Sequence, residues 1–386
     1  MKGHRKRYGA RLNNGGDNPS WSMSVLPYVL ISDILAQLPM QKILQCRCIC
    51  KIWYNLLIGQ DSDVLQSAKV RDTLVFRTPT EKGQSDIYLF ELEPGLEQVM
   101  KFNYTKASLP NRSRLALVGS CNGLLCLYDL DSVKSLYVVN PMTGEYVQTP
   151  PKLKKERRHA GTLVDAVHGF GFSPVTNQYK VIRVFEKSLG EIFTLGTNKW
   201  RSIGKTPFPA NKEFFGVPLN GAIHWIANNE FPSSELICAF DIDSEKVRTT
   251  SPPPDFHDYN PEGMMLRVLG GFLYICNNYA GLDFTIWVMK IYGVEESLTS
   301  KEIVIARNSP KPDFRTIRPM MILKDGNVLI LRDDETLELY DPTRKKFGNI
   351  AIKGVSSILE AVNYVASFDS LRDIVKGECV RDLYVK

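Results

Sequence analysis

Histidine and its acidic neighbours are the side chains of this sequence that could take part in acid–base chemistry. Among five histidines, His257 is followed by Asp258, an order that would supply a base and the carboxylate that orients it. The pair lies in the proline-rich segment SPPPDFHDYN, and no serine or cysteine can be placed beside it, so a catalytic triad is unsupported. His224 lies within an apolar strand pattern, where a packed histidine is the ordinary role. The GFGF run at 169–172 precedes no helix and makes no nucleotide fingerprint. We therefore predict no catalytic residue.

Cysteine and aspartate clusters are the candidate metal ligands. Cys46, Cys48 and Cys50 fall in a segment with helical spacing, in which residues i and i+4 share a face and i+2 points away. The three sulfurs therefore cannot converge on one ion, and no second ligand cluster lies nearby. Asp241 and Asp243 would suit a calcium loop, but the remaining oxygen ligands are lacking, and both fit a hairpin turn. We predict no metal and no cofactor.

Composition limits the class of protein. The chain has 386 residues, of which 44% are hydrophobic, and a net charge of +6. This length suits a small domain plus a large one, and the mild charge is not the basic stripe of a dedicated nucleic-acid binder. The eight cysteines are scattered through apolar runs, with no secretory signal and no apolar run near the ~18 residues of a membrane span. The sequence therefore predicts reduced thiols in the cytoplasm and/or nucleus, and neither nucleic acid nor a membrane as partner.

The elements that would position a site begin after a polar, basic segment. Residues 1–24 combine five basic residues with NNGGDNPS, which is typical of a disordered tail. This basic cluster is either a nuclear-import signal or a solvated tail. Residues 25–66 are predicted to form three short helices, because Pro27 and Pro39 stand where prolines open helices and apolar residues recur at helical spacing. Three such helices cannot bury this surface on themselves, so either the rest of the chain or another protein must cover it.

The rest of the chain has the pattern of repeated β-hairpins. LALVGSCNGLLCLYD and SLYVVNPMTGEYVQTPP each carry a tight turn between apolar runs, and together they predict a four-stranded antiparallel meander. Four further units follow at a period of about 50 residues, near that of kelch-type propeller blades. The first turns of the five units lie near Asn122, Val175, Asn220, Gly270 and Asp325.

Strand-like segments remain at both ends of this array, at 73–103 and 358–371. Each is too small for a blade, but joined they make a sixth blade that closes the ring and leaves only short sheet edges. The predicted fold class is mainly β, with a short three-helix N-terminal module at 25–66 followed by a six-bladed β-propeller. The propeller spans 73–371 and is closed by strands from both ends, with a C-terminal tail at 372–386.

The helical segment resembles a known motif, the F-box. The matching residues, in family order and spacing, are Leu26-Pro27, Leu30, Ile34-Leu35, Leu38-Pro39, Leu44, Arg47, Cys50-Lys51, Trp53 and Leu57. Family members usually have an acidic residue just after the Leu-Pro, where this chain has Tyr28 and Val29. The resemblance implies docking on a Skp-type adaptor of a cullin-RING (SCF) ubiquitin ligase. The implied adaptor-binding residues are Leu26, Pro27, Leu30, Leu38, Pro39, Ile43 and Leu44.

The body resembles the F-box-associated domain common in plant F-box proteins. The resemblance rests on VGSCNGLLCL, NPMTGE, HGFGF followed by YKVIRV, LNGAIHW, AFDIDSEKV and IWVMKIYGVEESLT. Leu298 stands where the family usually has tryptophan. The resemblance implies a non-catalytic substrate-recognition subunit of an SCF ligase, whose propeller binds a protein substrate. The alternative is a propeller enzyme or small-ligand sensor whose F-box only controls its turnover.

The predicted topology divides the propeller into two faces. The hairpin turns are short and share one face, whereas longer links such as PKLKKERRHAGTLVD and PPPDFHDYNPEG lie on the other. Long loops on a rigid scaffold often carry binding, and aromatic and arginine residues are enriched at hot spots. The predicted substrate-binding residues are Lys154, Lys155, Arg157, Arg158, Phe208, Phe231, Phe256, Tyr259, Tyr279 and Phe314. The basic run suggests an acidic or phosphorylated substrate segment, and a solvated loop beside packed aromatics is the alternative.

Overall fold

The computed structural model describes most of the helical module and the strands of the body. The described residues are 27–46, 48–49, 51–58, 73–80, 85–92, 98–101, 114–130, 135–150, 166–185, 189–210, 216–228, 237–251, 263–277, 284–294, 297–298, 300–305, 316–350, 352, 355, 357–375 and 380–383. No helix among these residues is long and apolar enough to cross a membrane.

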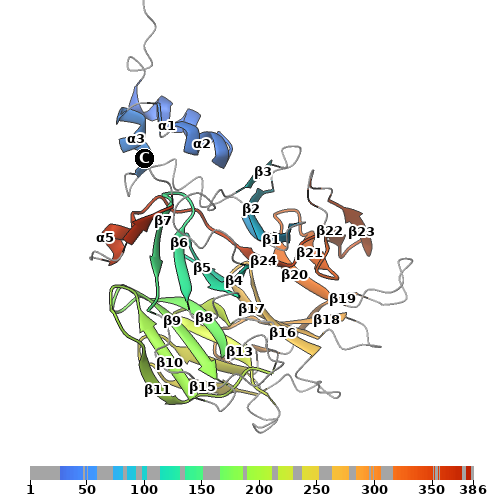
Figure 1. Ribbon diagram of the computed structural model, residues 1–386. Coiled ribbons are helices and arrows are strands. Elements are labelled where there is room, and N and C mark those ends of the chain that lie inside the picture. Colours follow the sequence, from blue (N-terminus) through green and yellow to red (C-terminus); the bar gives the residue numbers. More distant parts are fainter. Residues whose placement is uncertain are drawn as a thin grey trace, which may run out of the picture.

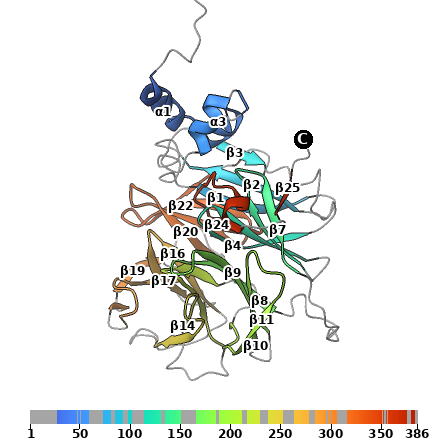
Figure 2. The ribbon, with the colours of Figure 1, turned by 90° about the vertical axis from the view of Figure 1, so that its left-hand side faces the viewer.

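Three described helices open the chain, namely α1 (Tyr28–Ala36), α2 (Met40–Cys46) and α3 (Lys51–Ile58). The carbonyl of Pro27 accepts the N–H of Ile31 at 3.2 Å, and the carbonyl of Pro39 accepts the N–H of Ile43 at 3.0 Å. Both prolines therefore stand at helix starts, where a missing N–H costs nothing. Figures 1 and 2 show the helices at the edge of the β body, beside β2 and β3.

The described strands form six antiparallel sheets, which are the blades of a propeller. Blade 1 contains β4 (Leu115–Cys121), β5 (Leu124–Asp129), β6 (Leu136–Asn140) and β7 (Glu145–Gln148). Blade 2 contains β8 (Ala166–Ser173), β9 (Gln178–Phe185), β10 (Leu189–Thr194) and β11 (Arg201–Lys205). Blade 3 contains β12 (Val217–Leu219), β13 (Ala222–Ile226), β14 (Ile237–Asp241) and β15 (Val247–Thr250). Blade 4 contains β16 (Met264–Leu269), β17 (Phe272–Asn277), β18 (Phe284–Met289) and β19 (Ser300–Ile305). Blade 5 contains β20 (Ile317–Ile322), β21 (Val328–Arg332), β22 (Thr336–Asp341) and β23 (Lys346–Asn349).

Blade 6 joins the two ends of the body. Its order is β24 (Glu360–Asn363), β1 (Thr73–Pro79), β2 (Ser85–Glu91) and β3 (Gln98–Lys101), with Leu74 opposite Asn363. The innermost strands touch in the cyclic order β4, β8, β12, β16, β20, β24 and back to β4. The six-bladed ring and its closure by strands from both ends are thus confirmed.

The turns form where the sequence predicted them. Asn122 and Gly123 between β4 and β5 have φ values of 47° and 81°, and Asn220 and Gly221 between β12 and β13 have 48° and 72°. Two successive positive φ values are the mark of the tight hairpin turn that Asn-Gly favours. These turns therefore lie on one face of the disc, and the strand ends that flank the longer links lie on the opposite face.

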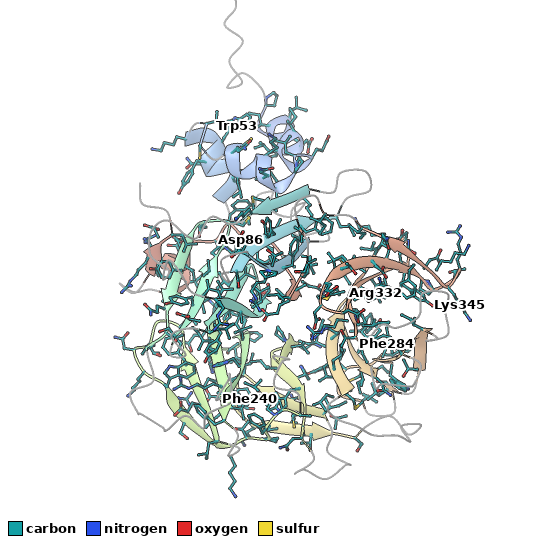
Figure 3. The ribbon with its side chains drawn as sticks, turned by 45° about the vertical axis from the view of Figure 1, so that its right-hand side comes forward. Trp53, Asp86, Phe240, Phe284, Arg332 and Lys345 are labelled. Carbon is teal, nitrogen blue, oxygen red and sulfur yellow. The ribbon has the colours of Figure 1, made fainter. Side chains whose placement is uncertain are left out.

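The C-terminal residues add to blade 1. The sequence assigned 372–386 to a tail, but α5 (Leu371–Val375) and β25 (Val380–Asp382) are ordered elements, and β25 pairs with β7 as a fifth strand. Apolar clusters fill the spaces within and between blades, as Phe240 in blade 3 and Phe284 in blade 4 illustrate (Figure 3). The described cysteines are free thiols, and Cys46, Cys126, Cys238 and Cys276 are buried.

Candidate functional site

Helix α1 divides into a buried and an exposed apolar face. Ile31 and Leu35 are 5% and 0% exposed, because they pack into the core shared with the propeller. Val29, Leu30 and Ile34 are 62%, 48% and 45% exposed. Leu30 and Ile34 are four residues apart, so they share one side of the helix. A small module that leaves three large apolar side chains in water on one helix presents a surface suited to a partner.

The predicted adaptor-binding residues are distributed over several environments. Pro27 and Leu30 are exposed, whereas Leu38, Pro39 and Leu44 are half-buried. Ile43 has no exposed surface, because it packs in the core cluster beneath α2, and its assignment to the binding surface is corrected. Leu26 lies outside the described residues.

Two further exposed apolar residues lie on the elements that follow α1. Ile49, between α2 and α3, is 63% exposed and Tyr54 on α3 is 43% exposed, while Trp53 and Leu57 are buried. Together with Val29 and Ile34 they were missing from the predicted set. The i to i+4 spacing from Leu30 to Ile34 is the signal that could have found Ile34.

A buried hydrogen bond fixes the helical module to the propeller. The N–H of Met40, the first residue of α2, donates to Oε2 of Glu91 at the end of β2 over 2.9 Å. Glu91 is 3% exposed and Met40 is 1% exposed, so the bond is shielded from water. A hydrogen bond to an ionised group is stronger than a neutral one, and here it also satisfies a helix N-terminal donor.

The joint also locates the module on one face of the disc. The core cluster that holds Ile31 and Leu35 includes Met142, from the turn between β6 and β7, and Tyr364 and Phe368, which follow β24. These positions all lie at the ends of strands that carry the short turns. The helical module therefore adjoins the hairpin-turn face, opposite the strand ends that flank the long links.

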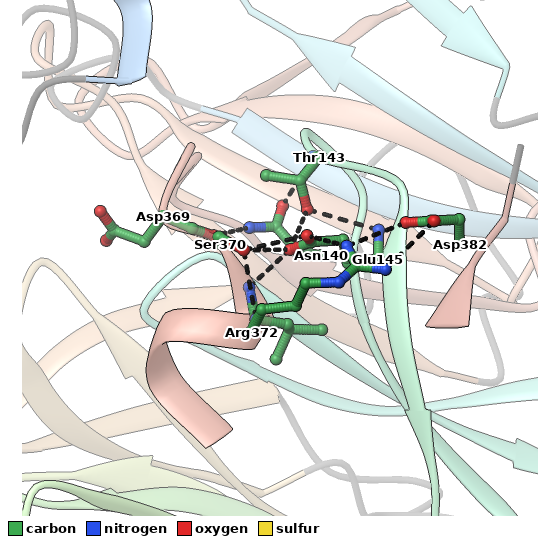
Figure 4. A network of polar contacts seen from close by, with 8 residues as sticks. Asn140, Thr143, Glu145, Asp369, Ser370, Arg372 and Asp382 are labelled. Atoms are coloured by element: carbon green, nitrogen blue, oxygen red, sulfur yellow. Dashed lines mark hydrogen bonds and ion pairs between the residues drawn. The ribbon is translucent and has the colours of Figure 1, made fainter. Parts of the chain in front are cut away.

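A polar network holds the C-terminal segment against that same turn (Figure 4). The carboxylate of Glu145 accepts the N–H of Leu371 at 2.6 Å and the hydroxyl of Ser370 at 2.9 Å, and it pairs with Arg372. Arg372 also pairs with Asp382 of β25, at 3.1 Å. The network restrains the β6–β7 turn on which the helical module rests.

Most predicted substrate-binding residues lie outside the described residues. This holds for Lys154, Lys155, Arg157, Arg158, Phe231, Phe256, Tyr259, Tyr279 and Phe314. Phe208 is described and only 4% exposed, because it packs with Trp225 in a core cluster of blades 2 and 3. Its assignment to a binding surface is corrected.

Among the candidate acid–base and metal-binding side chains, His224 packs in the core and Asp241 stabilises a hairpin turn. His224 is 2% exposed, with Nδ1 3.2 Å from the carbonyl of Val217 and Nε2 2.9 Å from the hydroxyl of Tyr292. Burial lowers the pKa of His224 to about 4, so the ring is neutral and packed. Asp241 accepts the N–H of Ser244 at 2.8 Å, as hairpin-turn aspartates do. The described residues contain no group of three or more histidine, cysteine or acidic side chains that could hold a metal.

Comparison with known proteins identifies both parts of the chain. Residues 23–64 match the F-box domain and residues 69–372 match the F-box associated beta propeller domain. This chain is a plant-type F-box protein with an F-box-associated propeller. Its relatives include F-box protein At3g07870 of Arabidopsis thaliana, 26% identical over 90% of this chain and 93% of the relative. F-box protein CPR1 of Arabidopsis thaliana is 25% identical over 89% of each chain.

Likeness to solved structures is much weaker. An oligogalacturonate lyase from Vibrio parahaemolyticus shares 12% identity at a TM-score of 0.37, covering 75% of this chain and 81% of that one. A likeness at this level carries no argument about chemistry. The F-box and the propeller, by contrast, support the general role of an SCF substrate receptor, in which the F-box binds an adaptor of a cullin ligase.

Proposed function

We propose that this F-box protein is the substrate-recognition subunit of an SCF ubiquitin ligase. Its F-box docks a Skp-type adaptor, and its propeller binds a protein substrate. The chain is a non-catalytic adaptor, and ubiquitin transfer takes place on other subunits. The cysteines that the structure describes are free and mostly buried, which suits the reducing conditions of the cytoplasm and/or nucleus that we propose as the compartment.

The division of α1 is the observation that carries this proposal. The propeller covers Ile31 and Leu35 but leaves Leu30 and Ile34 in water. Burying a large aliphatic side chain contributes about 1.5–3 kcal/mol, so these two residues supply a substantial driving force for docking. Ile49 and Tyr54 add apolar surface on the neighbouring elements.

The rigid joint supports the second half of the proposal. A receptor acts by raising the effective concentration of its substrate near the ubiquitin carrier, and this depends on a fixed distance and direction. The buried bond between Met40 and Glu91 and the restrained β6–β7 turn supply such a connection. The long links, which lie outside the described residues, remain the predicted substrate surface.

Reconstitution of the ligase tests the proposal. The full chain would be purified with a Skp-type adaptor, a cullin and its RING subunit and mixed with ubiquitin, ATP and the ubiquitin-activating and ubiquitin-conjugating enzymes. Ubiquitin transfer onto lysines of the chain itself would then be followed. We expect transfer with the wild type and its loss in the double variant Leu30→Asp with Ile34→Asp. The control is Val175→Asp, since Val175 is 81% exposed on the β8–β9 turn of blade 2, outside the helical module. Equal transfer in all three proteins would overturn the docking assignment.

The substrate face has its own test. Reversing the charges of Lys154, Lys155, Arg157 and Arg158, and separately changing Phe256 and Tyr259 to alanine, should leave adaptor binding intact. At least one of these two variants should lose the substrates that the wild-type chain captures when the proteasome is inhibited. Capture that persists in both variants would show that the substrate uses another surface.

A further inference from the structure

A cavity lies on the axis of the propeller, where the innermost strands meet. Its volume is about 280 Å³, and its lining includes residues of β4, β12, β16, β20 and β24. Asn122 and Val365 at its rim are exposed, Val365 by 45%, so the cavity opens on the hairpin-turn face. Ligand sites in proteins begin at roughly this size, about 300 Å³, so only a small molecule fits.

The charged side chains in this cavity are mostly basic. Among the described residues that line it, two are arginines, Arg267 of β16 and Arg318 of β20, and one is acidic, Glu360 of β24. Arg318 is 7% exposed and Arg267 is half-buried, and both line the cavity. Two guanidinium groups in one enclosed space repel each other and are costly to desolvate.

The acidic residue of the cavity is already engaged. The carboxylate of Glu360 accepts hydrogen bonds from Nε and Nη2 of Arg77, at 3.0 and 2.7 Å, and from the N–H of Leu117, at 2.6 Å. Glu360 therefore serves the joint between blade 6 and blade 1 rather than neutralising the cavity. Arg318 pairs with Asp334 at 2.9 Å, but Asp334 stands outside the cavity lining.

The charge pattern has a measurable electrostatic consequence. Burial, and next the neighbouring Arg318, lower the pKa of Arg267 to about 10. The guanidinium remains protonated at neutral pH, so the cavity keeps its positive charge. An anion between the two arginines would relieve this repulsion and receive charge-assisted hydrogen bonds from planar donors that match carboxylate and phosphate groups.

We propose that the axial cavity binds a small molecule through a carboxylate or phosphate group held by Arg267 and Arg318. The walls that would contact the rest of the ligand are apolar and include Val118, Val217, Val268 and Met320. The site is independent of the F-box surface and goes beyond substrate recruitment. Its occupation would stabilise the ring where five of its innermost strands converge, on the face that carries the F-box.

Gly119 offers a clean way to occupy the cavity. It lines the cavity, its φ is not in the left-handed region, and a Cβ built on it would meet no heavy atom within 4 Å. Gly119→Glu would place the carboxylate of its own side chain in the cavity, and Gly119→Leu would fill the cavity without charge. Gly119→Ala is the matched control. None of the three removes an existing contact, so the ring should still fold.

The experiment follows the melting temperature of the full chain with added citrate or inorganic phosphate, at ionic strength held constant with sodium chloride. For the wild type and Gly119→Ala we expect at least one of these anions to raise the melting temperature by about 2 °C or more once the anion concentration exceeds its dissociation constant. For Gly119→Glu and Gly119→Leu we expect no dependence on either anion, and for Arg267→Gln an affinity at least about tenfold weaker. No shift in the wild type, or an equal shift in Gly119→Glu, would overturn the proposal. Stabilisation by a poly-glutamate peptide and by neither small anion would overturn it as well, because the ligand would then be a protein segment.

Discussion

Replacing Glu91 should loosen the F-box from the propeller without opening the ring. The carboxylate of Glu91 accepts the N–H of Met40 over 2.9 Å in a site closed to water. Hydrogen bonds to charged groups contribute about 1.5–3 kcal/mol, and neutral ones about 1 kcal/mol. We therefore expect Glu91→Ala to destabilise the joint by about 1.5–3 kcal/mol and Glu91→Gln by less. A loss of about 2 kcal/mol corresponds to roughly 30-fold faster local opening.

Hydrogen–deuterium exchange of the α2 amides measures this opening directly. We expect peptides that cover Met40–Cys46 to exchange faster in Glu91→Ala, while those that cover the inner strands of the distant blade 4 keep wild-type rates. Glu335→Gln is the control, because Glu335 is an exposed propeller glutamate whose loss should change neither region. Wild-type exchange of α2 in Glu91→Ala would refute the view that this bond fixes the F-box.

Three further changes test the ring and its buried groups. Gly123→Ala should destabilise the chain by well over ~1 kcal/mol in denaturant unfolding, because Gly123 has a φ of 81° and an added Cβ would clash with the Cβ of Ser367 at 2.3 Å. Gly270→Ala, with a φ of 55° and open space around it, should cost less. Truncation after Gly354 removes β24 and should leave the body unfolded or aggregated in size-exclusion chromatography, and a soluble product with an unchanged melting temperature would contradict the closure. The pKa of His224 is lowered to about 4 from an ordinary 6.5, so between these pH values the unfolded chain binds more protons than the folded one. The free energy of unfolding should therefore fall as the pH drops from 6.5 toward 4, by at most ~1.4 kcal/mol per pH unit for this group. Denaturant midpoints of His224→Gln should depend less on pH in that window, and an unaltered dependence would contradict the assignment.

The features that the sequence predicted are those with local causes. Asn122-Gly123 and Asn220-Gly221 adopt the positive φ values of tight turns because asparagine and glycine tolerate them, whatever the surrounding fold. The hairpin period followed from these turns, and closure followed from the leftover strands. Pro27 and Pro39 likewise marked helix starts through the geometry of the proline ring.

The features that the sequence missed depend on distant partners. Helix α5 and strand β25 are too short for a hydrophobic period, and they are held by contacts such as Arg372 with Glu145, 227 residues away. Phe208 lies in a proline-rich stretch with the look of a surface link, yet it is buried against Trp225, whose indole N–H donates to the carbonyl of Pro207 at 3.1 Å.

The axial arginines did leave a signal in the sequence. Arg267 and Arg318 stand on the innermost strands of successive blades, at a separation close to the blade period of about 50 residues. Aligning the repeats on their first turns, near Gly270 and Asp325, leaves the two arginines at different offsets, because Arg267 stands three residues before its turn and Arg318 seven before its own. Local irregularities also decide which side chains of an innermost strand face the axial cavity. One example is the register shift between Pro319 and Met321 in β20.

Titration of a Skp-type adaptor into the full chain tests the central claim most directly. Leu30→Asp with Ile34→Asp removes the exposed apolar pair of α1 and would bury two charges in the complex, without touching Ile31 or Leu35. Loss of both aliphatic contacts corresponds to about 3 kcal/mol or more, so calorimetry should show affinity at least ~100-fold weaker than wild type. Val175→Asp should bind as the wild type does. An unchanged affinity in the double variant, with the fold intact by circular dichroism, would contradict the claim that α1 is the adaptor-binding face.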